Sequence, residues 1–322
     1  DKTDIELRKE VGFKDTRDWK LDKARQALKL KQQYKRFITE VQYRPFDTRW
    51  TYLDKTLVTY PRPLILSSIF NRENQVLCVG QQGNVIGDDE WSLIYTSTLP
   101  TDINVVPRGG IYLFPMIIYD GMLKYANFSP DILQNIENRI GLQLQDVEDE
   151  ERKENGFLAI DLIDYIYAVL HSVTYRDTYH DFLQNDFPTI PYPASAEYFF
   201  KMAEFGKRLR YLHELKGIDR KDLITTYPVI GEKDNNVVLI HKFEETNEGI
   251  GRVWINKEQY FDGVPLEAWN MIIAGYQPLE KWLKDRKDKH LTSDEIIHYQ
   301  KMVVALVKTI RTQEKIDEII EL

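Results

Sequence analysis

Between residues 60 and 125 the chain alternates short β-prone runs with turn residues. The runs are rich in β-branched and aromatic residues, and they read LILSSIF, VLCVG, WSLIYTS, INVVP and IYLFPMIIYDG. The turn residues between them are Gly80, Gly83–Asn84, Gly87–Asp88, Pro107 and Gly109–Gly110. This pattern predicts a β unit of about five or six strands.

A segment of mixed aromatic and charged residues, YRPFDTRW at 43–50, precedes this unit. Pro45 disfavours a helical conformation at Arg44. We therefore expect an extended segment that opens the β unit and buries Tyr43, Phe46 and Trp50.

From residue 161 to about residue 217 the apolar positions recur at helical spacing. Asp161 is predicted to cap the first helix. Prolines at 188, 191 and 193 must end the second helix and force an extended segment from about Phe187. A third helix is expected to start at Ser195 or Ala196. The apolar positions of the three helices are Leu162, Ile163, Ile166, Val169, Leu170; Tyr175, Tyr179, Phe182, Leu183; and Phe199, Met202, Phe205, Leu209, Leu212.

The last part of the chain predicts a small sheet and a long helix. Strands are expected at 237–243 and 251–256, and Asn247–Gly249 is expected to form a hairpin turn. Thr292 and Glu295 have the spacing of a capping box. The helix that follows carries one apolar stripe, formed by Ile296, Tyr299, Met302, Val303, Leu306 and Ile310.

Together these patterns predict an α+β fold. A β-rich N-terminal lobe would be followed by a mostly helical lobe with a small second sheet and a long C-terminal helix. We expect a helical connector at 1–40, the β-rich lobe at 41–125, a linker at 126–160 and the helical lobe at 161–322. The linker holds a short helical piece and then the acidic stretch DVEDEERKENG.

Size and composition indicate a globular protein. The chain has 322 residues, of which 43% are hydrophobic, so it can bury a sizeable core. One cysteine, Cys78, excludes an internal disulfide and a cysteine-based metal cluster, which fits the cytoplasm. The six histidines show no zinc-ligand spacing. The start DKTDIELRKE has no initiator Met or signal pattern, and no run has the length of a membrane span, so we expect a non-membrane piece of a longer protein.

Charge is distributed unevenly along the chain. The net charge of −8 argues against indiscriminate coating of nucleic acid. Residues 1–72, however, hold 17 basic and 10 acidic side chains, which leaves 26 basic and 41 acidic for the rest. The front of the chain is therefore the part that is suited to contact phosphate.

Candidate DNA-contact residues lie in this basic front and in the polar loops of the β unit. Arginine, asparagine and glutamine can pair bidentately with guanine or adenine edges. Two alternatives stay open: an arginine of the YRPFDTRW segment can pair with Asp47 instead, and loop asparagines also serve turns. The candidates are Arg44, Arg49, Arg62, Asn71, Arg72, Asn74, Gln81, Gln82, Asn84 and Arg108.

Motifs for catalysis do not occur in the sequence. The N-P-P-Y or D-P-P-Y loop of N6-adenine methyltransferases and the Walker A loop are both missing. The charged residues at 280–287 fit the solvated side of a helix better than a nuclease centre. We therefore name no catalytic, cofactor-binding or metal-binding residue in this chain.

Four stretches resemble the C-terminal target-recognition region of type ISP single-chain restriction-modification enzymes, which are related to type IIG enzymes. These are YRPFDTRW, YIYAVLHSVTYRDTYHDFLQNDFPTIPYP, GRVWINKEQYFDGVPLEAW and GYQPLEKWLKDRK with a later HYQ. The departures from the family wording are few. They are Leu53 in place of Tyr, Val173 in place of Pro, Ala274 in place of Gly and Pro278 in place of Val.

The resemblance implies sequence-specific recognition of double-stranded DNA. The parent enzyme would be a DNA adenine-N6 methyltransferase with ATP-dependent restriction endonuclease activity, both carried by upstream domains. S-adenosylmethionine, ATP and Mg²⁺ are implied for that full-length protein and no cofactor for this fragment. The upstream methyltransferase domain would be its partner. The alternative is a scaffold that docks protein and leaves DNA untouched, as the acidic total charge and the apolar C-terminal helix also suggest.

Overall fold

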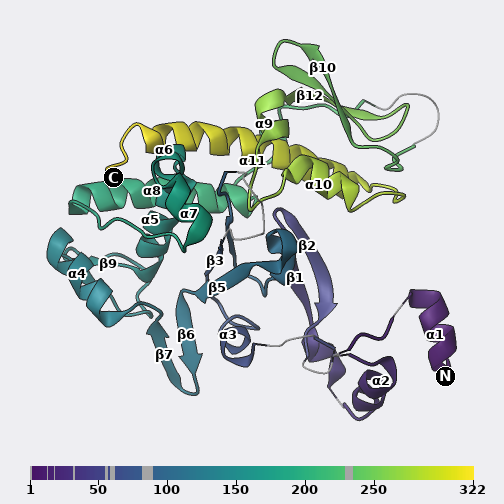
Figure 1. Cartoon of the computed structure of the whole chain (residues 1–322), viewed down its shortest axis with the longest axis horizontal. Helices are drawn as coiled ribbons and strands as arrows, with labels where there is room; N and C mark the ends of the chain where they lie inside the picture. Colours follow the sequence, from purple (N-terminus) through teal and green to yellow (C-terminus); the bar gives the residue numbers. More distant parts are fainter. Residues whose placement is uncertain are drawn as a thin grey trace.

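The computed structural model in Figure 1 has the predicted α+β fold, with a β-rich N-terminal half and a long C-terminal helix. It describes residues 2–12, 14–17, 19–31, 33–54, 57–58, 62–81, 90–228 and 235–322. No helix within those residues is both long and apolar enough to cross a membrane. The two chain ends lie on opposite sides of the molecule in the view of Figure 1.

The described residues of the N-terminal half form three small antiparallel sheets. The first is the β1–β2 hairpin, the second has the strand order β4-β3-β5, and the third is the β6–β7 hairpin. In the sheet of β3, β4 and β5, the strands β3 and β4 are buried along their whole length, whereas β5 exposes Tyr112 and Phe114. The strands are β1 (Ile38–Arg44), β2 (Asp47–Tyr52), β3 (Val76–Gly80), β4 (Ile94–Ser97), β5 (Ile111–Pro115), β6 (Ile117–Asp120) and β7 (Leu123–Ala126).

Two of the β-prone runs are short helices, so that part of the sequence prediction is wrong. LILSSIF contains α3 (Pro63–Ser67), because Pro63 occupies the first helical turn, where its missing N–H is not needed. INVVP contains the 3₁₀ helix η2 (Ile103–Val105), whose start is capped when Asn104 N–H donates to Asp102. The predicted turns at 83–84 and 87–88 lie outside the described residues.

The helical half is built on two helices that pack side by side in parallel, α5 (Ala159–His171) and α8 (Ala196–His213), since Phe157 contacts Phe199 near their starts and His171 contacts His213 at their ends. They approach so closely that a Cβ on Gly206 would lie 1.7 Å from the carbonyl oxygen of Asp164. A buried ion pair of Arg210 with Asp164, with N···O distances of 2.7 and 2.8 Å, joins the same two helices.

The first turns of α5 and α8 test the predicted caps. Ser195 caps α8 as predicted, since its Oγ accepts from the N–H of Tyr198. Asp161 is not the N-cap of α5. It lies in the first turn, because the helix starts two residues earlier, and its carboxylate accepts from the N–H of Leu158.

Between α5 and α8 the chain forms α6 (Val173–Thr178), α7 (His180–Asn185) and the predicted extended arm. The arm is fixed by tyrosine hydroxyls, which donate from Tyr175 to the Thr189 carbonyl and from Tyr165 to the Pro191 carbonyl, both at 2.9 Å. Phe187 at its start contacts the rings of Tyr112 and Phe114 on β5. The arm therefore connects the helical half to the central sheet.

The C-terminal part has the predicted sheet and helix, with shifted bounds. The sheet order is β10-β11-β12, and the hairpin turn contains Gly249. The first strand starts at Lys242 and not at 237. Thr292 and Glu295 form the predicted capping box at the start of α11. The elements are β10 (Lys242–Asn247), β11 (Ile250–Trp254), β12 (Tyr260–Pro265), α9 (Leu266–Asn270), α10 (Pro278–Lys284) and α11 (Ser293–Asp317).

The remaining elements flank this framework. Residues 126–160 contain a helix and a parallel two-stranded pair. One buried core continues from Phe46 to Ile316 across both predicted lobes, and the predicted domain limits stay a prediction. The elements are α1 (Asp4–Val11), α2 (Leu21–Lys29), η1 (Tyr34–Phe37), η3 (Pro107–Gly109), α4 (Pro130–Ile140), β8 (Gln143–Leu144), β9 (Gly156–Phe157) and η4 (Arg220–Asp222).

Candidate nucleic-acid interface

The turn of the β1–β2 hairpin is anchored in the core. Phe46 has φ of 60°, and its ring is buried against the rings of Tyr95 and His213. The hydroxyl of Tyr95 accepts from the Phe46 N–H at 2.9 Å. The Nε2 atom of His298 on α11 lies 2.7 Å from the Phe46 carbonyl oxygen, to which it donates when Nε2 carries the proton. Both backbone groups of Phe46 are thus held by distant side chains.

Asp47 is the centre of a charged cluster beside this turn. Its side chain is 2% exposed and accepts two hydrogen bonds from Arg286, at 2.9 and 3.2 Å. Arg286 also donates to Glu295 at 3.1 Å and lies 3.5 Å above the ring of Trp282. We call Asp47, Arg286 and His298 the Asp47 clamp. The clamp ties the start of the β-rich half to α10 and α11.

Arg44 and Arg49 lie on the hairpin next to the clamp. Their guanidinium carbons are 3.9 and 3.8 Å from the centre of the Tyr43 ring. Arg49 donates to Asp47 at 3.1 Å, which confirms the alternative of a local pair, and Arg44 pairs with Asp102 at 3.2 Å. The Arg49 side chain is 35% exposed and that of Arg44 is 12% exposed. Arg49 is therefore the better placed of the two to reach a phosphate.

The other candidates are spread over the β-rich half. Arg62 starts α3 and is exposed, and Arg72 lies 4.7 Å above the ring of Tyr119 on β6. Asn71 and Arg108 are exposed residues with left-handed backbone conformation. Gln81 follows β3 and is half-buried. Gln82 and Asn84 lie outside the described residues. The candidates that the structure describes are therefore not gathered into one cluster, and the DNA contacts of all of them stay predictions.

Asn74 has a structural environment that the loop sequence did not reveal. Its side chain is buried, and the amide nitrogen donates to the carbonyls of Ser68 and Ile117, both at 2.7 Å. The amide oxygen accepts from the Ile117 N–H at 3.0 Å. Bidentate pairing with adenine uses the same two atoms, so a base could reach this amide only if these bonds opened.

Replacing Asn74 by alanine is expected to lower the free energy of unfolding by about 1–3 kcal/mol, because buried backbone groups lose their partners. The sequence preference of DNA binding should stay unchanged. Urea unfolding checks the first expectation and binding-site selection the second. Asn138→Ala, on the exposed side of α4, serves as the control and should change stability by less than about 0.5 kcal/mol. Unchanged stability with altered preference would make Asn74 a base-contact residue.

Trp50 contradicts the expected burial, since 72% of this residue is exposed. In the hairpin register Trp50 lies opposite Glu40, and Arg49 points to the other face. The turn and Gln42 beside it are buried, whereas Trp50 in the middle of the hairpin is left open. Aromatic content alone does not tell which face of a ribbon is covered, so the exposure of Trp50 does not follow from the sequence.

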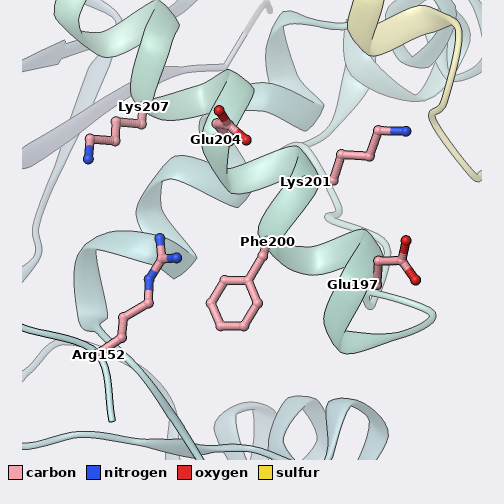
Figure 2. A pocket seen from close by; sticks show the side chains of 6 residues that line it. All are labelled: Arg152, Glu197, Phe200, Lys201, Glu204 and Lys207. Atoms are coloured by element: carbon pink, nitrogen blue, oxygen red, sulfur yellow. The ribbon is translucent and has the colours of Figure 1, made fainter. Parts of the chain in front are cut away.

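A separate hollow of about 490 Å³ lies beside α8. In Figure 2 Arg152 and Phe200 lie side by side there, and Lys201 and Lys207 extend in opposite directions. Arg152 donates to both carboxylate oxygens of Asp161, at 2.9 and 2.7 Å. The hollow therefore lacks converging groups for catalysis. Among the residues that the structure describes, no group of three His, Cys, Asp or Glu side chains is placed to hold a metal ion.

Three solved structures share this fold. One is described as "ATP-dependent Type ISP restriction-modification enzyme LlaBIII bound to DNA", with 18% identity, a TM-score of 0.66 and coverage of 99% of this chain and 21% of that chain. The "cryoEM structure DrdV-DNA complex" has 18% identity, a TM-score of 0.66 and coverage of 91% and 29%. A nuclease-deletion mutant of the type ISP enzyme LlaGI "in complex with a DNA substrate mimic" has 20% identity, a TM-score of 0.58 and coverage of 88% and 21%.

The chain thus spans between a fifth and a third of the length of these solved chains. No curated protein matches it. The model of one protein family, described as the type ISP C-terminal specificity domain, matches residues 1–322. Because the match covers the whole length, the chain belongs to the type ISP C-terminal specificity domain family.

Proposed function

We propose that this chain recognises a specific sequence in double-stranded DNA for a restriction-modification enzyme. The observation that carries the proposal is the shared fold over 99% of the chain with a type ISP enzyme described as bound to DNA. The family membership supports the same role. Methylation and cleavage would be the work of other domains of the same polypeptide.

The charge and geometry of the hairpin region support DNA contact. Residues 1–72 are net basic, although the whole chain has a net charge of −8. Backbone contacts from basic groups fix the register of a protein on the duplex, and side chains that reach base edges read the sequence. The hairpin offers Arg49 for the first task, and the loops near Asn71 and Gln81 offer polar groups for the second.

The longer enzyme would be a DNA adenine-N6 methyltransferase with an ATP-dependent nuclease, acting in the cytoplasm. S-adenosylmethionine, ATP and Mg²⁺ would bind its other domains, and the methyltransferase domain would be the neighbour of this one. The scaffold alternative loses its main support, since the apolar stripe of α11 is not free for docking. Tyr299, Met302, Val303 and Leu306 are fully buried in the core.

Salt dependence of DNA binding tests the proposal. A pool of random duplexes is first enriched for binders, and the affinity of the selected duplex is measured by fluorescence anisotropy at several salt concentrations. We expect tight binding whose logarithm falls linearly with the logarithm of salt concentration. If no duplex binds, or if the affinity does not change with salt concentration, the proposal is wrong.

The double variant Arg44→Ala, Arg49→Ala should bind the selected duplex more weakly, with the salt slope reduced by about one unit for each lost phosphate contact. The control variant Arg311→Ala, Lys315→Ala removes the same charge from the C-terminal part of α11 and should leave the slope unchanged. Unfolding curves establish that both variants are folded. An unchanged slope in the hairpin variant would restrict these arginines to their pairs with Asp47 and Asp102.

A further inference from the structure

We infer that the open face of the β1–β2 hairpin lies in the major groove of the duplex, with Trp50 at its centre. This inference rests on the proposed function and adds the surface that enters the groove. A two-stranded β-ribbon fits the major groove, which is about 12 Å wide.

The open face is defined by the strand register. Ile38, Glu40 and Gln42 of β1 pair with Tyr52, Trp50 and Thr48 of β2, so these six residues share one face. Gln42 is buried at the anchored end. Toward the other end Trp50 is 72% exposed and Ile38 is 48% exposed. Exposed apolar side chains that lie together on a mixed face of this kind are typical of a contact surface.

The face is held in place before any partner arrives. Phe46 and Asp47 anchor the turn in the core through the clamp described above. The edge of β1 is fixed by two backbone bonds, from Gln42 N–H to the Pro100 carbonyl at 2.8 Å and from Asp102 N–H to the Gln42 carbonyl at 2.9 Å. A partner that binds this face therefore loses little free energy to ordering the ribbon.

The charges around the face favour a polyanion. Residues 19–54 hold nine basic and four acidic side chains. Two of the four acids, Asp47 and Asp54, are buried and paired with Arg286 and Lys31, so their charge is compensated inside the protein. Lys35 and Arg36 are exposed directly before β1 and can contact the DNA backbone. A protein partner with an acidic surface is the alternative that the test must separate.

Glu40 decides which part of the DNA meets the face. It lies directly across from Trp50, and a carboxylate repels phosphate. At a base edge, however, a carboxylate accepts from the amino group of cytosine. The indole and Glu40 are therefore suited to the groove floor, and the flanking cations to the groove walls.

Tryptophan fluorescence gives a direct test on the intact chain. Of the six tryptophans, Trp50 is exposed, and the others, Trp19, Trp91, Trp254, Trp269 and Trp282, are half-buried or buried. Acrylamide quenching of the wild type minus that of Trp50→Phe isolates the signal of Trp50. We expect the selected duplex to protect this signal. Trp50→Ala should lower affinity about tenfold or more, as the loss of an aromatic contact typically does.

The matched control is Trp254→Ala, which removes a half-buried tryptophan from the C-terminal sheet and should leave affinity unchanged. If DNA binds and Trp50 stays as accessible to acrylamide as before, the inference is wrong and the proposed function stands. Protection that grows with protein concentration in the absence of DNA would assign the face to a second copy of the chain. If no duplex binds, the proposed function and this inference fail together.

Discussion

Arg286→Ala is expected to lower the free energy of unfolding by about 3–5 kcal/mol, the range typical when one partner of a buried ion pair is removed. Asp47 is 2% exposed and would keep only its single bond from Arg49. The variant also removes the cation that lies 3.5 Å above Trp282. The hairpin turn would then lose one of its two ties to the C-terminal helices.

Urea unfolding at pH 7.5 measures this effect, and a double-mutant cycle assigns it. If the clamp acts as a unit, Asp47→Ala with Arg286→Ala should cost clearly less than the sum of the two single variants. Glu295→Gln, which removes the charge of the more exposed partner of Arg286, should cost less than about 1 kcal/mol. If the loss of stability in the double variant equals the sum of the losses in the two single variants, the two residues stabilise the fold independently.

Amide hydrogen exchange locates the loss. Protection in β1 and β2 should fall more in Arg286→Ala than protection in α5 and α8, because the clamp holds the hairpin and the helix pair has its own ion pair between Arg210 and Asp164. Arg286→Lys keeps the charge and cannot donate the same planar fork, so it should restore only part of the stability.

Local signals in the sequence were sufficient for much of the fold. The capping box of Thr292 and Glu295 and the cap at Ser195 depend on residues within three or four positions of each other, and both were predicted. The start of α5 differs from the prediction because Asp161 lies inside the first turn. From there its carboxylate accepts from the N–H of Leu158, the N-cap residue. The apolar residues of LILSSIF are compatible with both a strand and a helix, and Pro63 in the first helical turn favours the helix.

The candidate site was harder to predict, because long-range contacts decide it. The pair of Asp47 with Arg49 spans two residues, and the sequence suggested it as an alternative. The pair of Asp47 with Arg286 spans 239 residues, and no local pattern indicates it. The burial of Asn74 likewise depends on Ile117, 43 residues away. Trp50 shows the same limit for exposure, since its environment depends on which face of the hairpin the core leaves open.

A buried pair of histidines predicts a strong pH dependence of stability. His171 is fully buried, and among the described residues neither ring nitrogen has a hydrogen-bond partner. Burial, the neighbouring His213 and Arg176 together hold the pKa of His171 well below its ordinary value of 6.5. Burial and Arg176 lower the pKa of His213 to about 3. His213 therefore stays neutral in the folded protein at pH 5, and the folded state disfavours protonation of His171 in the same direction.

The direction of the effect follows from proton linkage. Above pH 6.5 neither the folded nor the unfolded chain protonates these rings, so the full stability is present. As pH falls below 6.5, the unfolded chain binds protons at these rings and the folded chain does not. Stability is therefore lost progressively until the pH reaches the pKa of the folded state, which is about 3 for His213. At about 1.4 kcal/mol per pH unit below 6.5, His213 alone should cost about 2 kcal/mol between pH 7.5 and pH 5, and His171 adds to the loss in the same direction.

His171→Phe is expected to reduce the loss of stability between pH 7.5 and pH 5, because one of the two titrating rings is gone. A phenyl ring keeps the edge contact with Tyr167, whose ring centre lies 4.5 Å from that of His171. Urea unfolding between pH 7.5 and pH 4.5 measures the slope of stability against pH. His290→Gln, at an exposed position, is the control and should keep the wild-type slope. A folded His171→Phe variant with the wild-type slope would show that His171 takes up its proton in the folded state.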